Sequence, residues 1–145
     1  EAFFGTPSFP SSTTLQSTTN PHDTWVTVFN SSWTRYFVGR YKLTLSYGWS
    51  KNQTNSSFES RLVIGGTVYG DPFGNGVTHR QEPKDSQGPG NFSHQQNYFS
   101  HSWLYNYSGA PGGSETVVLQ FRSDSTNANA QANMWDPVIT IEFIY

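Results

Sequence analysis

The sequence predicts an all-β domain, an antiparallel β-sandwich of jelly-roll type with an extended N-terminal leader. Aromatic residues make up 17% of the 145 residues, a composition typical of strands. Short segments alternate between apolar and polar residues, and turn-forming residues separate them. No segment of ten or more residues shows helical spacing. We therefore expect a leader over residues 1–23, rich in Ser, Thr and Pro, and one sandwich domain over residues 24–145.

The first half of the domain contains three predicted strands and a hairpin. Residues 25–29 (WVTVF) form a short strand. From Gly39 onward every second residue is large and apolar, which is the period of a half-buried strand. This apolar set consists of Tyr41, Leu43, Leu45, Tyr47 and Trp49. The same alternation returns over residues 58–64, and a Gly-Gly pair then predicts a tight hairpin turn into residues 67–69.

The second half of the domain contains three further alternating segments. Residues 98–107 place five rings on one face, those of Phe99, His101, Trp103, Tyr105 and Tyr107. After an Ala-Pro-Gly-Gly turn, residues 117–122 alternate again, and residues 139–145 form a last, strongly apolar strand. Because an exposed apolar edge invites aggregation, we expect this last strand in the centre of a sheet or in a subunit interface.

Composition excludes several classes of protein. Cysteine is absent, so neither disulfides nor thiolate chemistry are available. The formal net charge of −2 and the lack of Lys/Arg clusters disfavour nucleic-acid binding. The apolar runs are too short for a membrane span. The N-terminus shows no signal-peptide pattern and no initiator Met, so we expect a processed chain or a piece of a longer protein.

Residues 79–90 (HRQEPKDSQGPG) concentrate charge in a chain in which only 12% of residues are charged. The interpretation we favour is a structural latch, in which these side chains pair with one another across strand ends or a subunit boundary. Arg61 and Arg122, both on predicted strands, are expected to supply a further partner. The latch residues are His79, Arg80, Glu82, Lys84 and Asp85.

An enzymatic role for this segment is the weaker alternative. Glu82 and Asp85 are the residue types of a glycosidase carboxylate pair, but a Pro- and Gly-bearing loop leaves their separation undefined. The four His residues lack a metal-ligand spacing, and residues 71–75 and 124–129 resemble solvated turns more than calcium loops. No nucleophile motif or phosphate loop is present. We expect a protein that is not an enzyme and that holds no cofactor or metal.

The aromatic segment over residues 98–107 offers candidate ligand contacts. Aromatic faces stack on pyranose rings while amides read hydroxyl groups, so we name Tyr105, Asn106 and Tyr107 as candidate ligand-binding residues. The alternative is that the ring-bearing face is core, which is favoured for Phe99 and Trp103. His101 is expected to be a hydrogen-bonded packing residue. A carbohydrate-binding module attached to an enzyme is therefore the alternative function.

The ordered set of segments carries a resemblance to a known family. The set is STTLQSTT with WVTVF, GRYKLTLSYGWS, SSFESRLVIGG, HRQEPKDSQG, SETVVLQFRSDS and ITIEFIY. Over residues 13–145 it resembles a β-sandwich module of bacteriophage virion surface proteins, of jelly-roll or tumour-necrosis-factor-like type, found in fibres, spikes, tail-needle knobs and decoration proteins. The aromatic cluster over residues 98–107 departs from a generic member.

This resemblance implies a non-enzymatic knob at the surface of a phage particle. It implies a homo-oligomer, commonly a trimer, that contacts other virion proteins and acts in host attachment or capsid decoration. A host-surface glycan or receptor is the further partner that such a role implies.

Overall fold

A computed structural model describes residues 4–5, 14–17, 24–51, 57–71, 74–81, 97–124 and 131–145. Within these ranges every regular element is a strand, and no helix is present that is long and apolar enough to cross a membrane. The strands are β1 (Phe4–Gly5), β2 (Thr14–Ser17), β3 (Val26–Arg35), β4 (Gly39–Lys51), β5 (Ser57–Ile64), β6 (Thr67–Tyr69), β7 (His79–Gln81), β8 (Asn97–Tyr107), β9 (Gly113–Asp124) and β10 (Gln131–Phe143).

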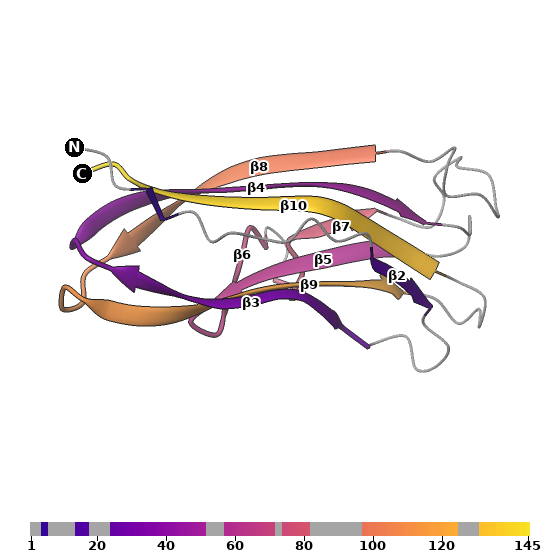
Figure 1. The fold of residues 1–145 in the computed structure, drawn as a ribbon, viewed down its shortest axis with the longest axis horizontal. Coiled ribbons are helices and arrows are strands. Elements are labelled where there is room, and N and C mark those ends of the chain that lie inside the picture. Colours follow the sequence, from indigo (N-terminus) through magenta and orange to yellow (C-terminus); the bar gives the residue numbers. More distant parts are fainter. Residues whose placement is uncertain are drawn as a thin grey trace.

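The strands form two antiparallel sheets that pack face to face, as Figure 1 shows. Sheet A has the order β1-β10-β4-β8, with β2 also paired to β10. Sheet B has the order β3-β9-β5-β6, with β7 also paired to β5. This arrangement confirms the predicted all-β sandwich, and it places β10 between neighbours on both sides, as expected for the apolar last strand.

The pairing is nested in the manner of a jelly roll. Strand β5 pairs with β6, β4 with β8, β3 with β9 and β2 with β10, so successive pairs enclose one another along the chain. The innermost pair is the predicted two-residue hairpin. Its central residues, Gly65 and Gly66, have φ values of 57° and 83°, a left-handed conformation that favours glycine. The sequence therefore specifies the turn at the centre of the nest.

The core lies between the sheets and consists of the alternating apolar residues of the long strands. Leu43, Leu45, Leu119 and Ile139 are completely buried, and each such side chain stabilises the fold by about 1.5–3 kcal/mol. The predicted inward sets of β4 and β9 are thus confirmed, whereas in the predicted last strand Ile139 and Ile141 are buried but Tyr145 lies beyond β10 and is exposed. The buried cluster consists of Phe29, Trp33, Tyr41, Leu43, Leu45, Tyr47, Trp49, Phe58, Leu62, Ile64, Val117, Leu119, Phe121, Ala132, Met134, Ile139 and Ile141.

Three segments differ from the sequence-based expectation. Strand β3 extends to Arg35, beyond the predicted 25–29. Strands β1 and β2 lie inside the predicted leader and pair with β10, so these parts of residues 1–23 belong to sheet A. Strand β7 lies inside the charged segment and pairs with β5. The boundary between leader and domain at residue 24 stays a prediction.

The edges of the two sheets differ in length. In sheet A the edge strand is β8, with eleven residues. In sheet B the edge consists of β6 and β7, each of three residues, which pair with different parts of β5. Residues 70–78 connect these two short strands. The inner face of β8 is therefore opposite an interrupted edge.

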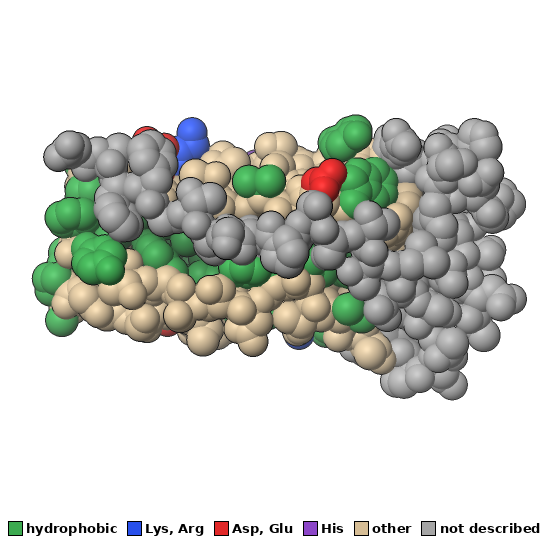
Figure 2. Space-filling view, viewed as in Figure 1, with side chains coloured by type: hydrophobic (Ala, Val, Ile, Leu, Met, Phe, Trp, Pro, Cys, Tyr) green, Lys and Arg blue, Asp and Glu red, His purple; other side chains and the backbone are tan. Residues whose placement is uncertain are grey.

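Hydrophobic side chains reach the surface at the end of the sandwich where β10 ends (Figure 2). The exposed residues there belong to the β3–β4 turn and to the segment after β10. They are Tyr36, Phe37, Val38, Ile144 and Tyr145. Phe37 also packs on Phe143, with the ring centroids 5.0 Å apart, so the turn and the last strand support one another.

Candidate functional site

His79 enters the sandwich from the edge strand β7 and packs among aromatic rings. Its imidazole stacks on Phe99, with centroids 4.3 Å apart and planes inclined by 14°. Three further rings lie 5.3–5.9 Å away, those of Tyr47, Trp49 and Phe58. Burial lowers the pKa of His79 to about 4, so the imidazole is neutral at pH 7. His79 therefore acts as a packing residue in the described structure.

The neutral imidazole of His79 has a hydrogen-bond partner in the core. Its Nδ1 lies 2.6 Å from the hydroxyl of Tyr47, which also lies 2.7 Å from the Oγ of Ser60. Burial raises the pKa of Tyr47 well above its ordinary value, so this phenol stays protonated. The Tyr47 hydroxyl can thus donate to His79 and accept from Ser60. This chain of contacts fixes β7 against β4 and β5.

Arg80 takes part in an ion bridge on the outer face of sheet B. Its Nη1 lies 3.3 Å from Oε1 of Glu59, and Nε of Arg122 donates to Oε2 of the same carboxylate over 2.6 Å. The Glu59 side chain is only 1% exposed. This Glu59 bridge (Glu59, Arg80, Arg122) ties β7, β5 and β9 together. Arg122, expected as a partner of the charged segment, reaches Arg80 through Glu59.

The ring of Trp25 contacts two guanidinium groups beside the Glu59 bridge. The guanidinium carbon of Arg61 is 4.3 Å from the Trp25 ring centroid, and that of Arg122 is 4.4 Å away. Nε of Arg61 donates to Oε1 of Gln120 over 2.6 Å. Desolvation, together with the neighbouring Arg122, lowers the pKa of Arg61. Arg61 thus stabilises this surface through the ring of Trp25 and an amide.

Glu82, Lys84 and Asp85 lie outside the described residues. The structural latch as a whole therefore stays a prediction, and so does the weaker alternative of a carboxylate pair. Within the described ranges, no three His, Asp or Glu residues come together as a potential metal site. The Asp71 carboxylate accepts the backbone N–H groups of Asn75 and Gly76 over 3.1 and 2.7 Å, so it holds a turn.

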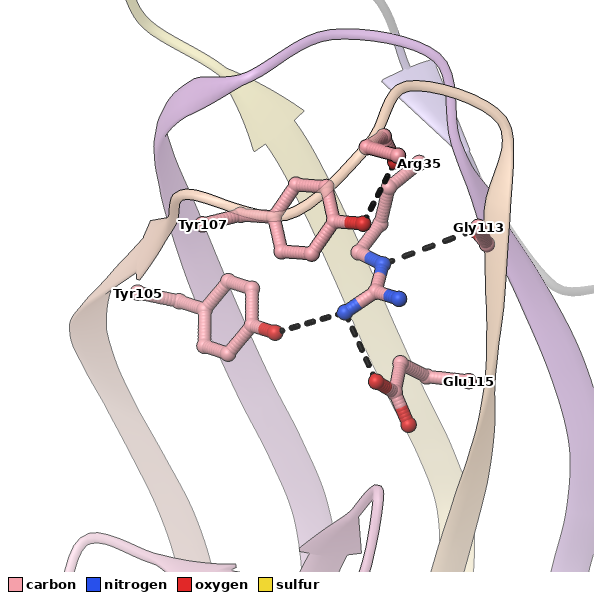
Figure 3. A network of polar contacts seen from close by, with 6 residues as sticks. Arg35, Tyr105, Tyr107, Gly113 and Glu115 are labelled. Atoms are coloured by element: carbon pink, nitrogen blue, oxygen red, sulfur yellow. Dashed lines mark hydrogen bonds and ion pairs between the residues drawn. The ribbon is translucent and has the colours of Figure 1, made fainter.

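Tyr105 and Tyr107 take part in a polar network around Arg35 (Figure 3). Arg35 ends β3 on the inner side and is only 6% exposed. Its guanidinium lies over the Tyr107 ring, 3.7 Å from the centroid, and Nη1 donates to the Tyr105 hydroxyl over 3.1 Å. Nη1 also lies 2.7 Å from Glu115, and Nε donates to the carbonyl of Gly113 over 3.4 Å. This network links β3, β8 and β9.

The three candidate ligand-binding residues do not point into one site. The Tyr107 hydroxyl donates to the carbonyl of Ala110 over 2.6 Å, which closes the turn after β8. Asn106 lies on the opposite face of β8, where its Oδ1 accepts from Nε of Arg40 over 3.1 Å. Both tyrosines thus bond to groups on the inner side of β8 or in the turn after it, and Asn106 bonds to Arg40 on the outer face. A ligand-binding role for these residues stays a prediction.

A groove opens between β8 and the interrupted edge of sheet B. We call this opening the edge groove, and its volume is about 570 Å³. The described residues that line it are Gly70, Asp71, Thr78, Phe99, His101 and Trp103. Gly70 has φ +68°, and a Cβ there would lie 2.4 Å from the Trp103 indole. The position of the Trp103 indole in the edge groove therefore depends on a glycine at residue 70.

His101 differs from its expected role. It is exposed, and its ring lies 4.8 Å from that of Trp103. Within the described part of the chain, the side chains of His101 and Trp103 form no hydrogen bond. Phe99 and Trp103 pack against the core as partly buried rings. The strand thus presents its predicted ring-bearing face, with His101 open to solvent at its middle.

Sequence reasoning did not single out Arg35 or Glu59 as network residues. Arg35 is in phase with Phe29 and Trp33, which are buried, and this phase is a signal that an inward Arg needs a partner. Glu59 carries no such signal, because it is out of phase with the buried residues of its strand. Its partner Arg80 is brought to its side by β7, a strand that the alternation did not predict.

Comparisons with known proteins give a limited result. No family model matches the chain, and no curated protein matches it. Four chains of solved structures match. One comes from a structure of infectious bursal disease virus Gx strain, with a TM-score of 0.41 and 7% sequence identity over 98% of this chain. The present chain spans 39% of the length of that chain.

Proposed function

We propose that this chain is a non-enzymatic structural and adhesive module of a bacteriophage virion. In this proposal it associates with copies of itself as a trimer and acts in host attachment or capsid decoration. The ordered set of sequence segments supports the assignment to a virion module, and the nested jelly-roll pairing agrees with the fold that this set implies. Other virion proteins and a host-surface glycan or receptor are the proposed partners.

The observation that carries the non-enzymatic part is how the described charges are used. General acid–base catalysis needs a titratable group that reaches substrate and has a pKa near the working pH. Glu59 is almost completely buried between Arg80 and Arg122, and the pKa of His79 is lowered to about 4 within an aromatic cluster. These groups join strands. They are therefore suited to holding the domain together rather than to proton transfer.

The outer face of sheet A supports self-association. Three large apolar side chains stand out on it, Tyr98, Leu104 and Val138, which are 75%, 57% and 48% exposed. Short hydroxyl side chains lie among them, such as Thr44 and Ser102. A second copy would remove these apolar side chains from water, and it would also meet Lys42 and Glu142, which are cross-strand partners on the same face. The proposed contact is therefore this face of sheet A.

The oligomeric state tests this proposal. We expect a trimer in native mass spectrometry at micromolar concentration. A double variant, Leu104→Glu with Val138→Glu, should become monomeric with an unchanged circular dichroism spectrum, whereas Thr116→Glu on the outer face of sheet B should stay trimeric. A parent protein that is monomeric contradicts the self-association. Electron microscopy of the native particle tests whether the domain lies on its surface.

The edge groove favours a second candidate, a carbohydrate-binding module attached to an enzyme. Aromatic side chains beside polar groups are the usual composition of a saccharide site. A protein that binds a saccharide, stays monomeric and is absent from virus particles would select this candidate over the first.

A further inference from the structure

We infer that the edge groove is a binding site for a neutral saccharide built from hexopyranose rings. The role of this saccharide as the glycan contacted in host attachment rests on the proposed function. The presence of a saccharide site rests only on the geometry of the edge groove.

The groove follows from the different lengths of the two sheet edges. Strand β8 is longer than β6 and β7 together, and between the end of β6 and the start of β7 no strand of the described residues lies opposite its inner face. Phe99 and Trp103 are half-buried on either side of this opening, and His101 between them is exposed. The volume of about 570 Å³ is within the range typical of small-molecule sites. The opening is therefore large enough to hold a ligand.

Two lining side chains have polar groups that the described protein does not use. The indole N–H of Trp103 is a donor, and the imidazole of His101 offers one donor and one acceptor when neutral. Neither side chain forms a hydrogen bond within the described residues. Thr78 differs, because its hydroxyl already donates to the carbonyl of Tyr69 and accepts from the N–H of Leu62. Recognition would thus centre on β8.

The pairing of ring faces with hydroxyl-binding groups indicates a sugar. A pyranose ring carries C–H groups on its faces and hydroxyl groups around its rim. The rings of Trp103 and His101 supply apolar faces, their nitrogens supply donors and an acceptor, and the Asp71 carboxylate supplies further acceptor capacity. A purely apolar ligand would desolvate the nitrogens of Trp103 and His101 without giving them a partner, which carries a cost.

The charge of the lining indicates that this sugar is neutral. Asp71 is the charged group among the described lining residues, and neither Lys nor Arg is among them. A sialic acid carboxylate or a sulfate ester would be brought next to the Asp71 carboxylate, a group of like charge. Neutral hexoses avoid this repulsion, and their hydroxyl groups can donate to the carboxylate.

Gly70 holds the main ring of the site in position. Its Cα approaches the indole so closely that a Cβ would lie 2.4 Å from two carbons of the Trp103 ring. The positive φ of +68° also favours glycine at this position. Because the indole rests on backbone, its orientation is set before any ligand arrives, which lowers the cost of binding.

Nuclear magnetic resonance of the tryptophan side chains tests the inference. The ¹⁵N-labelled full chain is titrated with lactose, cellotriose, maltotriose and chitotriose, and with 3′-sialyllactose as the acidic probe. The indole N–H signal of Trp103 is the one that disappears in Trp103→Phe. We expect this signal to shift saturably with at least one neutral saccharide and to shift less with sialyllactose.

Variants then place the binding in the groove. His101→Ala removes an exposed side chain, so the fold should persist while the affinity for the binding saccharide falls about fivefold, the effect of one hydrogen bond. Thr116→Ala removes an exposed side chain from the outer face of sheet B and should leave the affinity unchanged. Equal losses in both variants, no shift with any neutral saccharide, or binding of sialyllactose alone would each overturn the inference.

The two proposals fail in different ways. If no saccharide binds but the protein is trimeric and lies on the particle surface, the groove inference is wrong and the proposed function stands. If a neutral saccharide shifts the Trp103 signal while the protein is monomeric and absent from particles, the site is correct and the virion assignment is wrong.

Discussion

The outer faces of the two sheets are built from the same alternating strands but are used differently. On sheet B the Glu59 bridge joins side chains from β5, β7 and β9, and the ring of Trp25, just before β3, contacts Arg61 and Arg122. On sheet A the contacts join exposed side chains, such as the hydroxyl pair of Thr44 and Ser102, 3.0 Å apart, and the hydrogen bond from Arg40 to Asn106 over 3.1 Å. Sheet A instead leaves large apolar side chains in water.

This difference teaches that outward positions of a strand can serve stability or recognition. A carboxylate that is almost completely buried has lost its hydration, so it contributes to stability only while both of its guanidinium partners are present. An exposed hydroxyl or apolar side chain contributes little to the free energy of unfolding of the monomer. We therefore expect substitutions on sheet B to change unfolding and substitutions on sheet A to change association.

Glu59→Gln should produce the largest loss of stability. It leaves the guanidinium groups of Arg80 and Arg122 beside a neutral amide, and breaking a buried ion pair in this way costs about 3 kcal/mol. Urea denaturation at pH 7 measures the free energy of unfolding. The matched control is Glu142→Gln on sheet A, which should change it by less than about 0.5 kcal/mol. Equal effects of the two substitutions would remove the distinction between the faces.

Acid should weaken the edge of sheet B through His79. The folded-state pKa of about 4 is below the unfolded value of 6.5, so the unfolded chain binds the proton more readily between these values. Stability is fully present well above pH 6.5 and falls as the pH decreases through 6.5 toward 4, by about 3 kcal/mol in total. His79→Phe keeps an aromatic ring and should flatten this part of the profile. A parallel pH dependence in both proteins would show that His79 does not titrate in this way.

Trp25→Leu should cost less than either change above. It removes the ring that contacts Arg61 and Arg122, and an exposed or half-exposed cation–π contact stabilises by about 1 kcal/mol. Tyr98→Leu on sheet A is the matched aromatic control and should have an effect within about 0.5 kcal/mol. Thermal unfolding followed by circular dichroism compares the two. A larger loss from Tyr98→Leu would mean that sheet A also depends on its exposed rings.

Ser102→Ala should have the smallest effect. Its hydroxyl contacts Thr44 on the exposed face of sheet A, where water replaces the lost contact, so the free energy of unfolding should change by less than about 0.5 kcal/mol. A loss above about 1 kcal/mol in urea denaturation would show that sheet A carries a stabilising network after all.

Alternation and turn chemistry were enough to predict the long strands. The inward residues of β4 and the Gly65-Gly66 hairpin follow from local sequence alone, because period and φ preference are local properties. Strands β1, β2 and β7 could not be predicted in this way. They are short segments without apolar alternation, and their hydrogen bonds come from β10 and β5, which are distant in the sequence.

The candidate site was predicted only in part, for a related reason. The ring-bearing face of β8 was identified, but which of its rings would be engaged depends on what lies across the sandwich. Tyr105 and Tyr107 meet Arg35, whereas His101 is opposite an interrupted edge. Which residues lie across the sandwich from β8 is set by the tertiary structure, so it could not be predicted from the spacing of residues along β8.

The nested pairing of the strands has a consequence for how the domain is made. Only the innermost hairpin brings together neighbours in sequence, and each enclosing pair must close a longer loop before it gains any contact. Sheet A receives its central strand only once a ribosome has delivered residues 131–143. Until that moment the edge of β4 that pairs with β10 is unpaired. From this topology we expect a slow, late closing step in folding. We also expect that the unpaired edge must be protected from association with other chains during synthesis.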